Sequence, residues 1–330
     1  MLNLPPALIL ERPRKLNEAL AYLDTHAGDV RVMAGGTDLV PNLKHGLYDE
    51  RKILSLSRLS ELDFVEISDA HIDIGVLLTL DALSRHDTLV ALLPALTHAA
   101  SLVAGPQLRQ MGTIGGNLCL DTRCVYINQT HFWRQSLGFC LKKDGTKCHV
   151  VETGKRCVAA ASNDTAPVLI SLDASVLLQS IHGERWVGLD AFYRADGVWN
   201  KVIERNELMT RIRVPMSATS RQMAYEKLRQ RGAIDFPWLS LALSYVRDDS
   251  WATDVRLIVS AIASKPKKVR LPGHRFELSK NGIESLCEVV FKQTKPLSNI
   301  NADIEWRREM VKHLTRRAVE QSLTPGSESR

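Results

Sequence analysis

The residues best suited to chemistry in this 330-residue chain are its cysteines, because five of the six fall between positions 119 and 157. Cys124, Cys140, Cys148 and Cys157 lie in a stretch, 119 to about 161, that shows no helix or strand periodicity. Their spacing, C-x15-C-x7-C-x8-C, is neither the C-x2-C of zinc ribbons nor the C-x2-C-x2-C of bacterial ferredoxins. A shared metal centre would offset the ordering entropy of so long a loop.

Clustered cysteines without an export signal favour a metal over disulfides. The N-terminal run MLNLPPALILERP has no basic flank before it and no small-residue cleavage site after it, so we interpret it as mature protein and expect a cytoplasmic location. Zinc, an iron–sulfur cluster, disulfides and free thiols all stay open on the residues alone. His131 or His149 could replace one cysteine at a zinc site, although a lone loop histidine is more often simply solvated.

Two glycine-containing segments have the composition of phosphate cradles. They are Ala34-Gly35-Gly36-Thr37-Asp38-Leu39, directly after a predicted strand, and Thr113-Ile114-Gly115-Gly116-Asn117. Glycines let backbone N–H groups approach an anion closely, and the Thr and Asn side chains can add hydrogen bonds. Two such loops would suit the pyrophosphate of a dinucleotide. Each alone is more often an ordinary turn, and neither is the G-x-G-x-x-G or G-x-x-x-x-G-K-[ST] motif.

The bulk composition is that of a globular protein of two or three units, with 45% hydrophobic and 24% charged residues. No apolar run is long enough to span a bilayer. The net charge of +6 comes mostly from the cysteine stretch, where seven basic residues face three acidic ones. With few aromatic residues among them, nucleic acid is a poor partner. The basic loop is either simply solvated or a docking surface for an acidic electron carrier such as a ferredoxin.

Hydrophobic patterning predicts the elements that must position these residues. We expect a helix over 14–27 ended by Gly28, a loop over 105–118, two strands over 167–179 around a turn at Asp173, and a closing helix over 302–321. Further strands are expected at 30–34, 52–56, 72–76, 221–229, 238–246 and 253–264, and helices at 80–87 and 90–103.

An ordered set of segments resembles the FAD-binding subunit of the xanthine oxidase/molybdenum hydroxylase family. The segments are AGGTDL (34–39), QLRQMGTIGGN (107–117), ASNDTAPVLISLDASVLL (161–178), ELMTRIRVP (207–215), AYEKLRQRGAIDFP (224–237) and IEWRREMVKHLTRRAV (304–319). The resemblance implies an α+β fold, a two-subdomain FAD-binding domain of the molybdenum hydroxylase flavoprotein type followed by a smaller α/β C-terminal domain. The implied ranges are 1–215 (subdomains at about 1–60 and 61–215), 216–324, and a tail at 325–330.

The same resemblance implies which residues contact FAD. They are Ala34, Gly35, Gly36, Thr37, Asp38, Leu39, Arg109, Thr113, Gly115, Gly116, Asn117, Asp164 and Lys227. Asp164 matches an acidic residue close to the flavin, and Lys227 a basic residue of the C-terminal domain near the cofactor. Without the resemblance, Asp164 would be interpreted as a turn or cap residue and Lys227 as a surface cation.

The cysteine stretch is an insertion relative to the family, because Asp164 follows Asn117 by 47 positions. An insertion at about 119–160 with four cysteines resembles a reductase branch of the family, which implies that Cys124, Cys140, Cys148 and Cys157 bind a 4Fe-4S cluster. Cys119 is then a packed thiol near the flavin, and Cys287 a core cysteine.

The resemblance implies an electron-transfer role, with no catalytic residues for the substrate in this chain. The expected partners are a molybdopterin-binding large subunit, a small 2Fe-2S subunit and a ferredoxin electron donor, in a dimer of heterotrimers without nucleic acid or membrane. Two alternatives stay open: a xanthine dehydrogenase-like subunit exchanging electrons with NAD, and a zinc-stapled, non-redox nucleotide-binding subunit.

Overall fold

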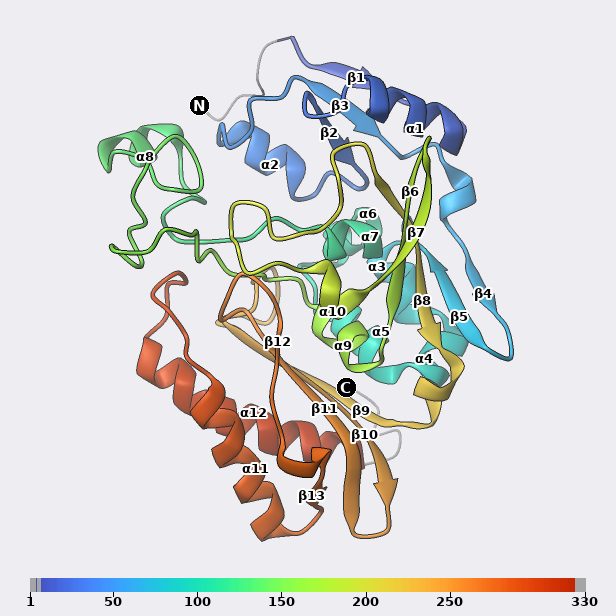
Figure 1. The fold of residues 1–330 in the computed structure, drawn as a ribbon, viewed down its shortest axis with the longest axis vertical. Coiled ribbons are helices and arrows are strands. Elements are labelled where there is room, and N and C mark those ends of the chain that lie inside the picture. The colour runs from blue at the N-terminus through green and yellow to red at the C-terminus, as the bar shows by residue number, and fades with distance from the viewer. Residues whose placement is uncertain (1–3, 5–6, 324–330) are drawn as a thin grey trace.

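Three β-sheets with their helices organise the chain in the computed structural model, which describes residue 4 and residues 7–323 (Figure 1). The predicted tail at 325–330 and most of the N-terminal segment 1–6 lie outside the described residues. The mixed architecture confirms the predicted α+β class. Within the described ranges, no helix is both long and apolar enough to cross a bilayer.

The first sheet is small and parallel. Its strands lie in the order β1 (Ile9–Glu11), β3 (Lys52–Ser55), β2 (Val30–Met33), with α1 (Leu16–Thr25) and α2 (Leu39–Lys44) in the connections. The helix α1 forms as predicted because Ala19, Leu20 and Leu23 fall on one buried face. It ends before Gly28, which adopts the φ of +89° that favours glycine.

The central sheet is antiparallel, in the order β4 (Val65–Ile67), β5 (His71–Gly75), β8 (Leu208–Pro215), β6 (Ser175–Ser180), β7 (Gly183–Gly188). Helices cover it and complete the largest hydrophobic core, which extends into the first sheet. These helices are α3 (Leu80–Arg85), α4 (Asp87–Leu92), α5 (Pro94–Ser101), α6 (Pro106–Met111), α7 (Ile114–Leu118), α9 (Thr165–Ser171) and α10 (Leu189–Phe192), with a 3-10 turn at Ser60–Leu62.

The C-terminal sheet is antiparallel, in the order β12 (Lys267–Lys268), β11 (Trp251–Ser260), β10 (Leu239–Asp248), β9 (Gln222–Leu228), with β13 (Phe276–Glu277) also paired to β11. The helices α11 (Lys280–Gln293) and α12 (Ile304–Leu323) pack together against it and enclose a second core (Figure 1). Short 3-10 turns at Met216–Ser220 and Pro272–His274 complete this part. The three predicted strands and the closing helix are confirmed; α11 was not predicted.

Three predictions from patterning are wrong. The apolar run at 167–171 belongs to α9, not to a strand, and only β6 follows the turn at Asp173. Every residue of α9 is buried, so the run carries no amphipathic period that would have indicated a helix. The predicted loop at 105–118 contains α6 and α7, which are too short to produce a periodic signal. Likewise, 80–103 holds three helices rather than two.

The cysteine stretch is irregular, as predicted, apart from the short helix α8 (His131–Ser136) (Figure 1). It extends beside the first sheet, where Arg134 anchors it. The guanidinium of Arg134 is buried and donates to the carbonyls of His45 (3.0 Å) and Gly46 (2.9 Å) at the end of α2. Arg134, which the sequence analysis counted among the basic residues of the loop, is therefore a buried structural residue.

A second buried arginine joins the parts of the C-terminal domain. Arg307 on α12 is fully buried and donates to three carbonyls, those of Trp238 (3.0 Å), Leu297 (2.8 Å) and Ala261 (2.9 Å). Burial lowers the pKa of Arg307 to about 10, so the guanidinium stays charged at neutral pH. Each carbonyl belongs to a different segment around α12.

We expect Arg307→Met to destabilise the protein by about 3 kcal/mol, because three buried carbonyls lose a charged donor. Urea unfolding followed by circular dichroism would measure the effect. Arg316→Met, on the same helix, removes only a surface ion pair with Glu284 and should cost less than about 1 kcal/mol. Equal losses for the two variants would contradict this account of Arg307.

Candidate functional site

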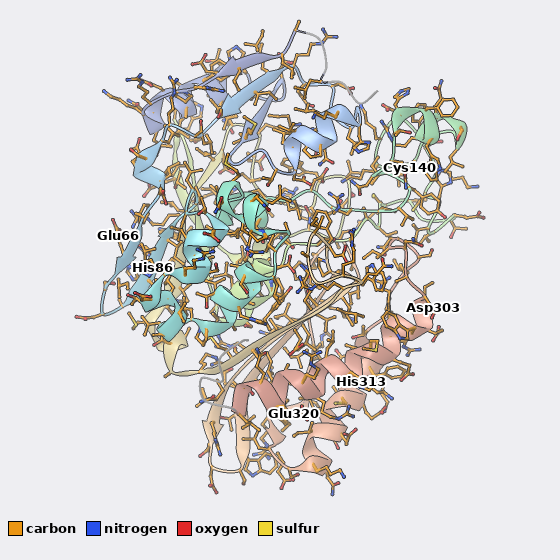
Figure 2. All side chains as sticks on the ribbon, turned by 180° about the vertical axis from the view of Figure 1, so that it is seen from behind. Glu66, His86, Cys140, Asp303, His313 and Glu320 are labelled. Atoms are coloured by element: carbon orange, nitrogen blue, oxygen red, sulfur yellow. The ribbon has the colours of Figure 1, made fainter. Side chains whose placement is uncertain are left out.

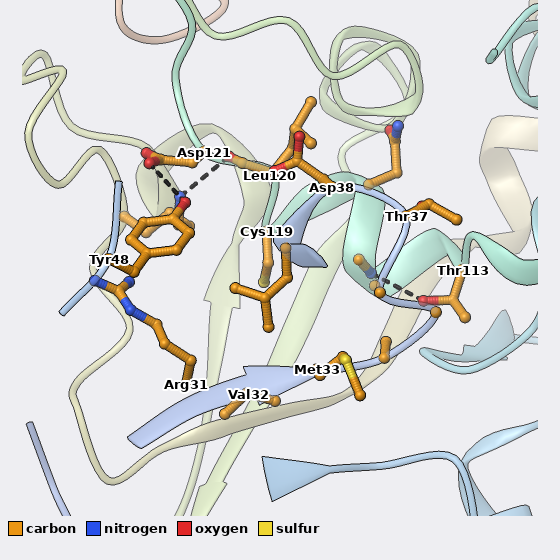
Figure 3. Close-up of a pocket in the computed structure, with 18 of the residues that line it drawn as sticks. Arg31, Val32, Met33, Thr37, Asp38, Tyr48, Thr113, Cys119, Leu120 and Asp121 are labelled. Carbon is orange, nitrogen blue, oxygen red and sulfur yellow. Dashed lines mark hydrogen bonds between the residues drawn. The ribbon is translucent and has the colours of Figure 1, made fainter. Parts of the chain in front are cut away.

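A cavity of about 830 Å³ lies where the first sheet, the central helices and the C-terminal domain meet (Figure 3). Both predicted glycine loops line it: all six residues from Ala34 to Leu39, and Thr113, Gly115, Gly116 and Asn117. The loop 234–236 from the C-terminal domain and the segment 198–201 line it as well. Its volume is within the range of pockets that bind cofactors.

Each glycine loop packs against a neighbouring segment too closely for a side chain at its glycine. A Cβ at Gly35 would lie 1.7 Å from the carbonyl oxygen of Met111, and one at Gly115 would lie 2.6 Å from the Cβ of Val76. Gly36 has a φ of +73°, which disfavours other residues. These glycines are therefore required by close approach and by backbone conformation.

The first loop presents unused backbone donors. Among the hydrogen bonds of the described residues, none uses the N–H groups of Gly35, Gly36 or Thr37 as donors. Three successive free N–H groups beside a cavity form a site suited to an anion such as a phosphate. This is the arrangement that the glycine composition predicted.

The backbone N–H donors of the second loop already have acceptors within the protein. The N–H groups of Ile114 and Gly115 donate to the carbonyls of Leu78 and Val76, both at 3.0 Å. The Thr113 hydroxyl accepts from Gly116 N–H (3.1 Å) and so caps α7. Asn117 Oδ1 accepts from the hydroxyl of Thr165 (2.7 Å) and fixes α7 to α9. This loop shapes the cavity wall, and its contact with FAD stays a prediction.

Asp164 lies at the start of α9 and lines the cavity, but its carboxylate is already paired. Asp164 Oδ1 accepts from the Tyr225 hydroxyl (2.6 Å) and from Lys227 Nζ (2.9 Å), and both charged side chains are almost fully buried. Burial raises the pKa of Asp164, and the Lys227 ammonium opposes that shift. The pair joins the FAD-binding region to the sheet of the C-terminal domain.

Lys227 and Arg109 do not line the cavity. Lys227 also donates to the carbonyl of Leu102 (3.0 Å), and Arg109 donates to that of Val103 (2.9 Å). In this structure both cations bind backbone beside the cavity. Their predicted contacts with FAD stay untested.

The predicted residue Asp38 is joined in the cavity wall by residues that the sequence analysis did not identify. Asp38 pairs with Arg123 (3.0 Å), whose guanidinium stacks on Phe236. Asp121 accepts from the hydroxyl of Tyr48 (3.0 Å) (Figure 3). It also accepts from the ammonium of Lys142 (2.8 Å). Burial raises the pKa of Asp38. The five added residues come from the first subdomain, the insertion and the loop after β9, so no sequence motif could have grouped them.

The four predicted metal ligands come together around a second, much smaller cavity of about 20 Å³. Cys124, Cys140, Cys148 and Cys157 all line it, and each is at most 9% exposed. Cys124, Cys140 and Cys157 contribute to a small hydrophobic cluster separate from the two main cores. Figure 2 shows Cys140 close to α8, at the side of the molecule. All six cysteines are free thiols, which leaves the four available as ligands.

Burial makes two of these thiols poor acids. It raises the pKa of Cys124 to about 12 and that of Cys157 to about 11. A cationic centre bound here would have to displace the protons of these two thiols. Within the part of the chain that the structure describes, no three His, Cys, Asp or Glu side chains converge on a point as ligands of a single metal ion.

The two histidines considered as zinc ligands have other contacts. His149 lines the small cavity, but its Nε2 lies 2.6 Å from the carbonyl oxygen of Phe139. His131 packs against the ring of Phe139 and does not line the cavity. The four cysteines therefore stay the predicted ligand set. Of the other two, Cys119 lines the large cavity and Cys287 is buried in the C-terminal domain.

The charge of the insertion is less exposed than its composition suggested. Five of its seven cations have acidic partners within 4.0 Å; these are Arg123, Arg134, Lys142, Lys143 and Lys147. Lys155 and Arg156 are exposed. Any electrostatic attraction of an acidic partner would therefore come from few free charges.

Comparison with known proteins gives consistent matches. Residues 7–217 match the family described as the FAD binding domain in molybdopterin dehydrogenase. The carbon monoxide dehydrogenase medium chain of Hydrogenophaga pseudoflava is 24% identical over 96% of this chain and 97% of its own. The glyceraldehyde dehydrogenase medium chain of Sulfolobus acidocaldarius is 26% identical over 96% and 99%. A chain of the CO dehydrogenase from Oligotropha carboxidovorans superposes with a TM-score of 0.79 at 25% identity, covering 97% of this chain and 99% of that one.

We expect Gly35→Ala to reduce the FAD content severely, because the added Cβ would collide with the backbone of Met111 and displace the loop that carries the free N–H donors. Flavin absorbance per chain in the purified protein would measure the loss. Gly232→Ala is a matched control, since a Cβ at that position meets nothing within 4 Å. Full flavin occupancy in Gly35→Ala would show that FAD binding does not depend on the close approach of Gly35 to Met111.

We expect Asp164→Asn to destabilise the protein by about 3–5 kcal/mol, because it leaves the Lys227 ammonium buried without its counter-charge. The double variant Asp164→Asn with Lys227→Met should recover part of this loss, since no unpaired charge remains. Urea unfolding of the two single variants and the double variant would give the coupling energy. Additive losses would show that the pair is not coupled.

Proposed function

Since the chain belongs to the family of FAD-binding domains of molybdopterin dehydrogenases, we propose that it is the electron-transfer subunit of a molybdenum enzyme and carries both FAD and a 4Fe-4S cluster. The 4Fe-4S part of this proposal rests on one observation: four buried cysteines line one cavity in an otherwise irregular insertion. Cys124, Cys140, Cys148 and Cys157 would hold the cluster. The residues from Ala34 to Leu39 would hold the FAD pyrophosphate.

We favour an iron–sulfur cluster over a zinc ion at this cavity. Four thiolates on one zinc must converge on a single point, whereas in a 4Fe-4S cluster each cysteine binds a different iron around a larger body. The four cysteines share a cavity but do not converge as ligands of one ion among the described residues, which is compatible with the larger group.

The proposed role is a relay between a one-electron donor and a two-electron reaction. FAD exchanges electrons singly or in pairs, and a 4Fe-4S cluster exchanges them one at a time. The chain would accept electrons from a low-potential ferredoxin and pass them to a small 2Fe-2S subunit and a molybdopterin-binding large subunit, in a dimer of heterotrimers. The substrate would bind to the large subunit.

The most specific form of this proposal is the β subunit of a 4-hydroxybenzoyl-CoA reductase, which removes the phenolic hydroxyl to give benzoyl-CoA. Its support is the resemblance of the insertion, NLCLDTRCVYINQTHFWRQSLGFCLKKDGTKCHVV, at 117–151 together with Cys157. Electron delivery from reduced ferredoxin, and none from NADH, to the assembled complex would support it. Efficient reduction by NADH would favour a xanthine dehydrogenase-like role.

We expect about four iron and four sulfide per chain in the purified complex, from the formula of the cluster. Cys140→Ser should lose most of the iron and sulfide and keep FAD, because Cys140 lines only the small cavity. Cys287→Ser is the matched control and should lose neither, since Cys287 lies in the C-terminal core. Metal and flavin analysis measures both. Zinc without sulfide in the unmodified protein would refute the cluster.

A further inference from the structure

The cavity assigned to FAD and the cysteine cavity share a wall. Two side chains, Lys142 and Ile127, line both cavities. The wall continues into the segment 197–201, which follows α10. Its Gly197 faces the cysteines: a Cβ there would lie 2.7 Å from the Sγ of Cys157. Val198 and Trp199, which follow Gly197 directly, line the large cavity.

Lys142 is held rigidly in this wall. Its ammonium donates to Asp121 Oδ1 (2.8 Å), to Thr122 Oγ1 (2.7 Å) and to the carbonyl of Gly197 (2.5 Å), and its side chain is 8% exposed. Gly197 in turn donates its N–H to the carbonyl of Cys157 (2.8 Å). Three acceptors around one ammonium fix its position between the two cavities. Asp121, by contrast, lines only the large cavity.

We propose that Lys142 is a positioning residue whose fixed positive charge sets the reduction potentials of both redox centres. This inference rests on the proposed function. Adding an electron to either centre adds a negative charge, and a buried ammonium nearby stabilises that charge. Lys142 is therefore expected to raise both potentials. Asp121, which lines only the large cavity, opposes this more strongly on the flavin side.

The redox step that this charge would influence is a simple electron transfer. The step would be the transfer of one electron from a ferredoxin-reduced cluster to FAD, with no covalent bond formed or broken. Two such transfers would reduce FAD to its singly protonated anion, with that proton taken from solvent. Because the ammonium of Lys142 would stabilise the added negative charge at each centre, its removal is expected to lower both potentials.

Potentiometric titration of the purified complex, followed by flavin absorbance and by EPR of the cluster, tests the proposal. In Lys142→Met both midpoint potentials should move to more negative values, whereas Lys142→Arg keeps the charge and should keep both potentials. Lys155→Met removes an exposed cation of the same insertion and should change neither. Asp121→Asn should move the flavin potential in the positive direction, and the cluster potential by less.

The opposite signs separate an electrostatic role from a merely structural one, because disrupted packing would not reverse direction between Lys142→Met and Asp121→Asn. If Lys142→Met does not fold, Asp121→Asn and Lys142→Arg still decide the question. Unchanged potentials in Lys142→Met or Asp121→Asn, with iron, sulfide and FAD retained, would overturn this proposal alone. Absence of iron and sulfide from the unmodified complex would overturn the proposed function instead.

Discussion

The close approach of two backbone segments, at Gly35 and Met111, is the constraint on which the rest of the site depends. It places the loop after β2 against the end of α6 and leaves no room for a side chain between them. The N–H groups of Gly35, Gly36 and Thr37 have no acceptor among the described residues. An anion in the cavity would satisfy those donors, so its binding would be linked to the packing of this loop against α6.

Charged groups then connect the other parts of the chain to this junction. Asp38, at the end of the first loop, holds Arg123 of the insertion, and Asp164 holds Lys227 of the C-terminal sheet. The Asp164–Lys227 pair is almost fully buried, and such a pair is a weak source of stability because the cost of removing both charges from water offsets their attraction. It does, however, make wrong docking costly, since a misplaced partner leaves a buried charge unpaired. The Asp38–Arg123 pair is partly exposed, so this effect is smaller there. The pairs therefore specify how three parts of the chain assemble around one cavity.

The sequence predicted the strands and the glycine loops well, because both have strong local signals. Alternating apolar residues gave β5, β9 and β10, and the composition of Ala34–Leu39 gave a loop with free donors. The helix α9 was missed since a fully buried helix has no polar face. The wall between the cavities was missed for another reason: Lys142, Asp121 and Gly197 meet only through tertiary contacts, and no spacing in the sequence links them. The count of basic residues in the insertion was also misleading, because most of these cations pair with acidic residues and are not free to attract a partner.

The insertion has a small hydrophobic cluster of its own, and hydrogen bonds and ion pairs join it to the rest of the chain. Cys124, Cys140 and Cys157 belong to that cluster, whereas the FAD-binding region and the C-terminal sheet each have a large apolar core. Burial raises the pKa values of Cys124 and Cys157, so both thiols would have to release a proton to bind a metal centre. On the proposed function, folding of the insertion would be coupled to metal binding, while both large cores lie outside it. Such a loop could then be added at this position without rebuilding either core. The contacts of Lys142 and Gly197 are what bring the added site into electrostatic reach of the flavin cavity.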